Sequence, residues 1–124
     1  MKLRLRDNSL RLRLLQSEIT RLKETGSVSE AITFGASQIL IYRLQISLEA
    51  QAISARFQNN EIIVEIPVEI AGRWINTEQV GLKTEQTPGD GKALLILIEK
   101  DFVCIDRPFD ADNKDAFPHP KIKC

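Results

Sequence analysis

After Met1, the chain begins with Lys2-Leu3-Arg4-Leu5-Arg6-Asp7-Asn8-Ser9-Leu10-Arg11-Leu12-Arg13-Leu14. Leucine alternates with a basic or polar residue on both sides of Asp7-Asn8, and this period of two around a turn-forming pair predicts a β-hairpin. A two-residue turn would place Leu5 opposite Leu10, Arg4 opposite Arg11 and Lys2 opposite Arg13. One face of the hairpin should therefore be leucine and the other basic.

Segments rich in β-branched and aromatic residues follow and predict four antiparallel strands, at residues 28–34, 39–48, 52–57 and 62–66. A polar strand is expected at 80–85, and an apolar, central strand at 93–98. Two short helices are expected, one capped by Ser17 and ending at Gly26, the other beginning at Pro67 and carrying Trp74. The fold class is thus α+β, built mainly on an antiparallel sheet of six to eight strands, either curled or half-barrel, with two short helices.

The length and composition are those of one globular domain. The chain has 124 residues, of which 43% are hydrophobic and 27% charged, so it can bury a core without disulfides or metal. No internal repeat or domain boundary is visible. Residues 106–124 are acidic and contain several prolines, and we expect an irregular tail packed on the domain through Phe109, Phe117 and Ile122.

The overall charge points to no particular class of partner. Seventeen basic and 17 acidic residues give a net charge of zero, which argues against nucleic acid or a membrane surface as the partner. No run approaches the ~20 apolar residues of a membrane span, and the first residues alternate leucine with charge. Cys104 and Cys124 are the only cysteines, too few for a disulfide scaffold. We therefore expect a cytoplasmic protein; whether these two cysteines pair stays open, as does the oligomeric state.

The basic face of the hairpin is the one candidate site. Like charges placed directly opposite each other destabilise a sheet, so Arg4 and Arg11 require a compensating anion. That anion is either a bound phosphate or carboxylate, which arginine holds with a planar fork, or glutamates of a neighbouring strand such as Glu61 and Glu65. The anion-binding hypothesis names Arg4, Arg6, Arg11 and Arg13, with Arg43 from the polar face of the strand at 39–48.

Metal binding and catalysis have no comparable support. The tail contains Asp106, Asp110, Asp112, Asp115 and the single histidine, His119, but their spacing matches neither a calcium loop nor a zinc site. No nucleophile motif surrounds His119, and the six glycines form no phosphate-binding loop. We therefore expect no catalytic residue, no metal and no cofactor, and we interpret Tyr42 and Trp74 as core residues.

Two resemblances can be stated on these residues. The opening residues 1–14, together with Glu99-Lys100-Asp101-Phe102 and Phe117-Pro118-His119-Pro120, resemble an uncharacterised group of small bacterial proteins. The basic hairpin leading into antiparallel strands is also similar to half of the CYTH-like triphosphate tunnel fold, whose interior is lined by charged side chains. The resemblance to that fold implies lost chemistry, because its leading Glu-x-Glu-x-Lys is replaced by Lys2-Leu3-Arg4-Leu5-Arg6.

The sequence leaves two functional hypotheses. The first is a non-catalytic binding or interaction module, which would use the basic hairpin face to bind an anionic small molecule. The alternative is an enzyme that acts on a phosphorylated or anionic small molecule, as a relative of the CYTH-like phosphohydrolases. Such an enzyme needs carboxylates or a metal beside the arginines, whereas a binding module does not.

Overall fold

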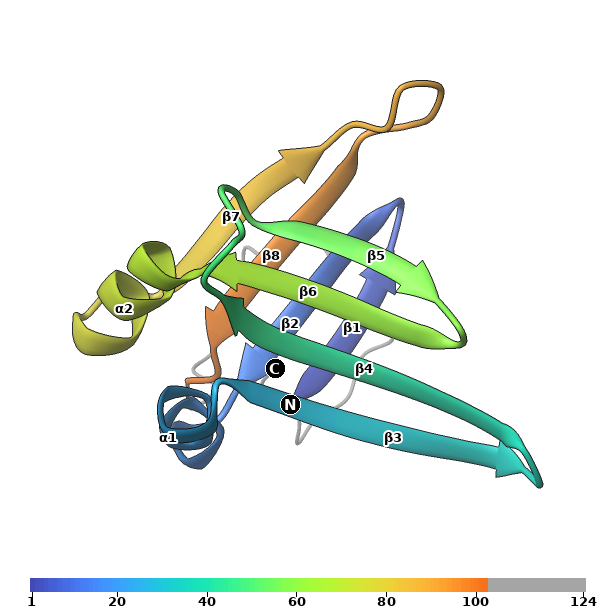
Figure 1. Ribbon diagram of the computed structural model, residues 1–124, viewed down its shortest axis with the longest axis horizontal. Coiled ribbons are helices and arrows are strands. Elements are labelled where there is room, and N and C mark those ends of the chain that lie inside the picture. The colour runs from blue at the N-terminus through green and yellow to red at the C-terminus, as the bar shows by residue number, and fades with distance from the viewer. Residues whose placement is uncertain (103–124) are drawn as a thin grey trace, which may run out of the picture.

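The computed structural model describes residues 1–102 and contains eight strands and two helices (Figure 1). In chain order these are β1 (Lys2–Arg6), β2 (Ser9–Leu14), α1 (Gln16–Thr25), β3 (Ser27–Gly35), β4 (Gln38–Ser47), β5 (Ser54–Gln58), β6 (Glu61–Pro67), α2 (Val68–Asn76), β7 (Gly81–Gln86) and β8 (Leu94–Lys100). The α+β class and the two short helices are confirmed. The expected tail at 106–124, with its aromatic, acidic and cysteine residues, lies outside the described residues.

The N-terminal hairpin forms as its alternation predicts. Strands β1 and β2 pair antiparallel, with Leu5 opposite Leu10 and Arg4 opposite Arg11. Asp7 and Asn8 both have positive φ, 47° and 60°, which is the backbone of the tight turn that matches the twist of paired strands. Buried Leu10, Leu12 and Leu14 show that the leucine face is the core face.

The strands form two four-stranded sheets instead of one curled sheet or half-barrel. The orders are β1-β2-β8-β7 and β3-β4-β6-β5, and each sheet has a parallel pair at its centre, β2 with β8 and β4 with β6. The four strands of residues 27–67 therefore do not run antiparallel in sequence order, because β6 lies between β4 and β5. The apolar strand at the C-terminal end is a central strand, as expected, since β8 is flanked by β2 and β7.

The two halves of the chain have the same structure. The series β1-β2-α1-β3-β4 corresponds to β5-β6-α2-β7-β8, and a pseudo-two-fold axis exchanges the two sheets. The turn Asn59-Asn60 repeats the positive φ of Asp7-Asn8, and the carbonyls of Asn8 and Asn60 accept equivalent bonds, from the amides of Leu95 and Ile41. The halves thus form a structural repeat, which the sequence analysis missed.

The helices of the repeat close one end of the molecule. Both pack at the left side of Figure 1, where each follows the second strand of its half. Helix α1 begins two residues earlier than expected, because Leu15, not Ser17, is its N-cap. The Glu18 carboxylate accepts a hydrogen bond from the Leu15 amide at 2.8 Å. Helix α2 contributes fully buried Ala71 and Trp74, so Trp74 is a core residue as expected.

Between the sheets lies a single apolar core. It is made mainly of leucine, isoleucine and valine on the facing sides of β2, β4, β6 and β8, where the deepest residues are Leu12, Leu14, Leu44, Val64, Ile66, Ile96 and Ile98. Tyr42 joins this core, and its hydroxyl donates a hydrogen bond to the Met1 carbonyl at 2.7 Å. Within residues 1–102 no helix has the length and apolar character needed to cross a membrane.

The second turn of the repeat allows a direct test of the backbone argument. We expect Asn60→Ala to lower the free energy of unfolding by about 1 kcal/mol, since alanine lacks the short polar side chain with which asparagine tolerates φ 60°. Asn60→Gly should cost little or nothing, because glycine accepts that conformation. Urea unfolding followed by tryptophan fluorescence measures both, and equal losses in the two variants would contradict the argument.

Candidate functional site

The basic side chains of the hairpin share the outer face of the first sheet. Arg4 lies directly opposite Arg11, and Lys2 lies opposite Arg13, so the like-charge pairing expected from the turn is confirmed. Arg6 is opposite Ser9 at the turn end of the hairpin. Because the neighbouring leucines point into the core, this face is directed away from the second sheet.

Acidic residues at the end of β8 accompany these cations. The Arg11 Nε lies 3.4 Å from the Glu99 carboxylate, and Asp101 lies 2.9 Å from the Lys2 ammonium and 3.4 Å from Arg13. The hydrogen bond from Lys2 lowers the pKa of Asp101 below its ordinary value; the charges of Arg13 and Lys2 add to this, while burial opposes it. The positive charge of the outer face is therefore partly neutralised by Glu99 and Asp101, which follow from β8 of the same sheet.

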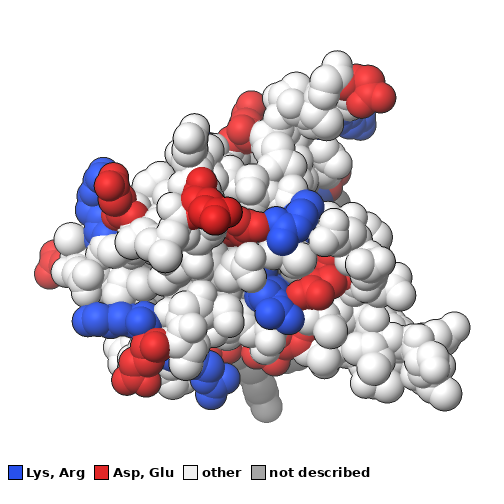
Figure 2. All heavy atoms as spheres, viewed as in Figure 1, with Lys and Arg blue, Asp and Glu red and all other residues white. Residues whose placement is uncertain are grey.

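The glutamates that were expected to compensate the charge of the hairpin arginines lie in the other sheet. Glu61 and Glu65 belong to β6 in the other sheet, where Glu61 lies 2.8 Å from Arg43 and Glu65 pairs with Arg56. Figure 2 shows basic and acidic groups side by side on the face of that sheet. The expectation failed because β8, not β6, pairs with β2.

Arg43 is consequently separated from the other four arginines of the predicted site. Its neighbours along β4, Tyr42 and Leu44, are buried, so Arg43 points outward from the second sheet. Arg4, Arg6, Arg11 and Arg13 point outward from the first sheet. The core lies between them, so the structure brings four of the five residues together and not the fifth.

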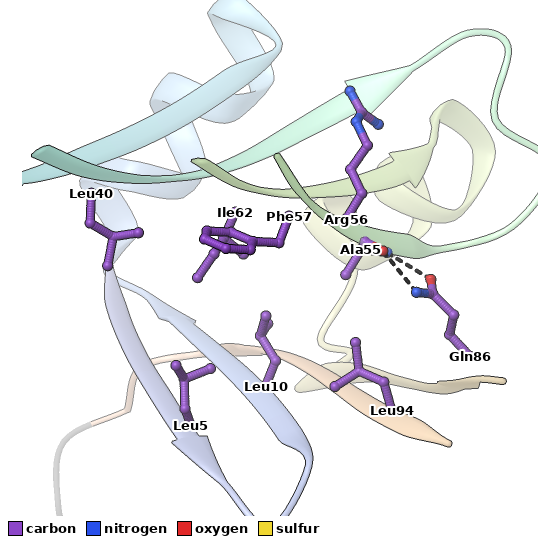
Figure 3. A pocket seen from close by; sticks show the side chains of 9 residues that line it. All are labelled: Leu5, Leu10, Leu40, Ala55, Arg56, Phe57, Ile62, Gln86 and Leu94. Carbon is purple, nitrogen blue, oxygen red and sulfur yellow. Dashed lines mark hydrogen bonds between the residues drawn. The ribbon is translucent and has the colours of Figure 1, made fainter. Parts of the chain in front are cut away.

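A cavity of about 550 Å³ opens between the two sheets at the end opposite the helices. Figure 3 shows Leu5, Leu10 and Leu94 pointing into it from the first sheet, and Leu40, Phe57 and Ile62 from the second. Leu5 and Phe57 are 60% and 67% exposed, which is high for such side chains. The core is thus left unfilled at this end and meets solvent at an apolar mouth.

The lining of the cavity follows the pseudo-two-fold axis. Leu5 corresponds to Phe57, Leu10 to Ile62 and Leu40 to Leu94, as the matching strand registers require. Each half therefore contributes one member of these three pairs, and the second half adds Ala55, Arg56 and Gln86. The cavity is thus bounded by both halves, with more of its lining from the second half.

Two polar side chains border the cavity. The Gln86 amide reaches across from β7 to the backbone of Ala55, whose N–H donates to it and whose carbonyl accepts from it, both at 2.8 Å (Figure 3). Arg56 also contacts the cavity, but its guanidinium points away from it and pairs with Glu65 (Figure 3). Since the donors and acceptors of Gln86 are engaged at the rim, the interior offers a guest mainly apolar contact.

Nothing in the sequence pattern predicted this cavity. Alternation showed which residues of β1 and β2 face inward, but an inward leucine in a filled core and one at an open mouth have the same pattern. The only available signal was Phe57, a large aromatic residue two positions before the second turn. Without the pairing of the halves, that signal could not be connected with Leu5.

A separate polar cluster surrounds the amino terminus of this chain. Met1 is a buried residue, and its ammonium bonds to the Glu18 carboxylate and lies 3.0 Å from Glu30. Burial acts to lower the pKa of this ammonium, but hydrogen bonds to Glu18 and Glu30 outweigh it and raise the pKa above 8.0. Burial likewise acts to raise the pKa of Glu18, while bonds from the ammonium and the Leu15 amide bring it below 4.5.

Within residues 1–102, no three histidine, cysteine or acidic side chains are grouped so that they could hold a metal ion. The tail residues considered for metal binding and nucleophilic chemistry, among them Asp110, Asp115, His119 and Cys124, lie outside the described residues.

Comparison with known proteins gives a family but no activity. A family model described as "Family of unknown function (DUF7009)" matches residues 1–121. No curated protein and no solved structure matches the chain. The resemblance to an uncharacterised family is therefore confirmed, whereas the similarity to the CYTH-like fold is not.

The terminal cluster predicts how stability changes with pH. The ammonium contributes stability below pH 8.0 and loses it as pH rises through its raised pKa, and Glu18 contributes above pH 4.5 and loses it as pH falls through its lowered pKa. Stability should be greatest between these limits. In this pH range, Glu18→Gln should lower the free energy of unfolding by about 1–3 kcal/mol. It should also weaken the pH dependence of stability at both the acid and the alkaline limit.

Chemical denaturation at a series of pH values measures this effect. Glu24→Gln, an exposed residue of the same helix, is the control and should leave the pH profile unchanged. A Glu18→Gln profile with the same shape as that of the unmodified chain would show that the cluster does not control the pH dependence.

Proposed function

The chain belongs to this family of unknown function, and we propose that it is a non-catalytic binding module that takes an apolar group into the cavity between its sheets. The observation that carries the proposal is the open, apolar mouth formed by Leu5 and Phe57. Folded proteins seldom expose paired large apolar side chains above an unfilled space unless something binds there. The volume, about 550 Å³, falls within the range of small-molecule sites.

The chemistry of the lining favours an acyl chain or a similar flexible apolar guest. Six of the nine lining residues are leucine, isoleucine or phenylalanine, and alanine is a seventh. Each methylene group removed from water there would contribute about 0.8 kcal/mol. Gln86 at the rim would lie beside the polar end of an amphipathic guest.

The lining also supports binding over catalysis. Among residues 1–102, Arg56 is the only ionisable residue of the lining, and its guanidinium does not serve as a general base. Acid–base or nucleophilic chemistry would need an additional group brought to the cavity. The alternative, an enzyme related to the CYTH-like phosphohydrolases, draws no support from a space that is apolar, since that fold has a charged interior.

A second candidate function is anion binding at the outer face of the hairpin. The register that sets Arg4 against Arg11, and Lys2 against Arg13, favours it. Glu99 and Asp101 already contact this face, so an anion would add to an existing ion-pair network. The face can select for phosphate groups, because arginine binds phosphate through two parallel hydrogen bonds.

The cytoplasmic location and bacterial origin expected from the sequence stay predictions.

The cavity proposal can be tested by filling the cavity. Ala55 lines it, whereas the equivalent residue of the first half is Leu3, which packs on the core. Ala55→Leu should therefore keep the fold and occupy the space. We expect a medium-chain fatty acid, titrated by calorimetry, to bind the unmodified chain with one site and to bind Ala55→Leu at least tenfold more weakly, which is about 1.4 kcal/mol.

Leu48→Ser is the control for surface hydrophobicity, since Leu48 is exposed and lies outside the cavity. It should leave the affinity unchanged, whereas Leu5→Ser at the mouth should reduce it. Equal affinity of the unmodified chain and Ala55→Leu, or no binding by either, would refute the proposal.

The anion candidate predicts a different measurement. If the hairpin face binds polyphosphate, the ligand should stabilise the native state by about 2.7 kcal/mol at a hundredfold excess over its Kd. Arg4→Ala with Arg11→Ala should abolish that gain. Arg21→Ala with Arg73→Ala removes the same charge from the exposed surfaces of the helices and should preserve the gain.

Thermal melts in chloride and in polyphosphate, at matched ionic strength, decide between a site and a salt-bridged face. A salt-bridged face predicts no shift specific to polyphosphate. It also predicts a loss of stability when Arg11 is removed, because Glu99 is left without its partner. Equal melting shifts in the unmodified chain and the hairpin variant would eliminate the anion site.

A further inference from the structure

Strand β3 forms an open edge of the second sheet. It pairs with β4 on one side only, and within residues 1–102 no backbone hydrogen bond reaches its other side. Its regular part ends at Thr33, where the register with β4 shifts. An unpaired strand edge presents a row of donors and acceptors that another strand can extend.

The other three edges of the two sheets are protected. Edge strand β1 carries Lys2 and two arginines, and β7 carries Lys83 and Glu85. Edge strand β5 is short, and the Gln86 amide occupies the backbone of Ala55. Charged side chains, short length and covering groups are the means by which natural sheets prevent association at their edges.

The repeat shows that the fold does not require an unprotected β3. Its equivalent in the second half is β7, because Ser27 and Gly81 occupy the same place in the registers with β4 and β8. Lys83 and Glu85 therefore correspond to Ser29 and Ala31. One half carries a charge at each of these positions and the other half does not, although the backbone is the same.

The hairpin of β3 and β4 also differs in surface character from the rest of the molecule. No charged residue occurs from Ala31 to Tyr42, in a chain with 27% charged residues. This hairpin projects from the body at the lower right of Figure 1, and Figure 2 shows that projection free of charge. On it, Ile32 and Phe34 are 43% and 70% exposed.

We propose that a second copy of this chain pairs with β3, antiparallel and about a two-fold axis near Ile32. Two copies of the same strand can pair antiparallel about a two-fold axis, because each then offers the other the same row of donors and acceptors. One exposed strand is therefore sufficient for a closed dimer. The absence of charge at residues 31–35 means that self-pairing places no like charges opposite each other. The dimer joins two four-stranded sheets into one of eight strands and covers Ile32 and Phe34.

This interface is independent of the proposed cavity function. The edge is formed by the backbone of residues 29–33, whereas the cavity is bounded on the second sheet by Leu40, Phe57 and Ile62. A ligand in the cavity and a partner on β3 can therefore be tested separately. Failure of one proposal does not affect the other.

The test introduces charge on the open edge. Ala31 and Thr33 are exposed, and Ala31→Lys with Thr33→Lys brings four lysines together at any dimer axis near Ile32. Light scattering coupled to size-exclusion chromatography, at loadings up to about 100 μM to include micromolar affinities, should give twice the chain mass for the unmodified protein and a single chain mass for the variant.

Gln51→Lys with Ala52→Lys adds the same charge to an exposed loop and should leave the dimer intact. Circular dichroism establishes that each variant is folded. Hydrogen exchange provides a second measurement, in which the β3 amides gain protection as concentration rises while those of β7 do not. A monomeric unmodified protein, a dimeric lysine variant, or unchanged β3 exchange would overturn the proposal.

Discussion

Two parallel strand pairings hold the two halves of this protein together. Strand β2 pairs with β8 and β4 with β6, so each sheet takes two strands from either half. Neither half has a complete sheet of its own, and a two-stranded hairpin is marginally stable in water. Leu12 beside Ile98 and Leu44 beside Val64 are fully buried at equivalent places, so the core forms where the halves meet.

The position of the cavity follows from this arrangement. In each half the helix comes directly after the second strand, and the two-fold axis therefore brings both helices to the same end. Trp74 and Leu22 fill the space between the sheets there. No third helix exists in residues 1–102 to fill the opposite end, where Leu5 and Phe57 stay exposed.

Local pattern predicted local structure well, and it failed where the partner of a strand is distant in sequence. The alternation and the Asp7-Asn8 turn determined the first hairpin and its register, because both depend on neighbouring residues. The pairing of β2 with β8 joins residues more than eighty positions apart, and nothing in either strand identifies the other. For this reason the partners of the arginines were misassigned to Glu61 and Glu65. The repeat was also invisible, since equivalent residues are rarely identical. Identical residues occur at Arg4/Arg56, Asn8/Asn60, Arg21/Arg73, Thr25/Thr77 and Leu40/Leu94.

The differences between the halves carry more information about function than their common features. The shared turns, helices and leucine-rich strands are what the fold needs, whereas Ala55 replaces Leu3 and Gln86 replaces Ile32 at equivalent positions. The smaller Ala55 lines the cavity, and Gln86 covers the edge of β5 by bonding to the Ala55 backbone. Isoleucine has no group that could form such bonds, and Ile32 instead lies exposed on the uncharged hairpin. The difference between Leu3 and Ala55 thus leaves room for the cavity. The difference between Ile32 and Gln86 leaves the edge at β5 covered and the edge at β3 open.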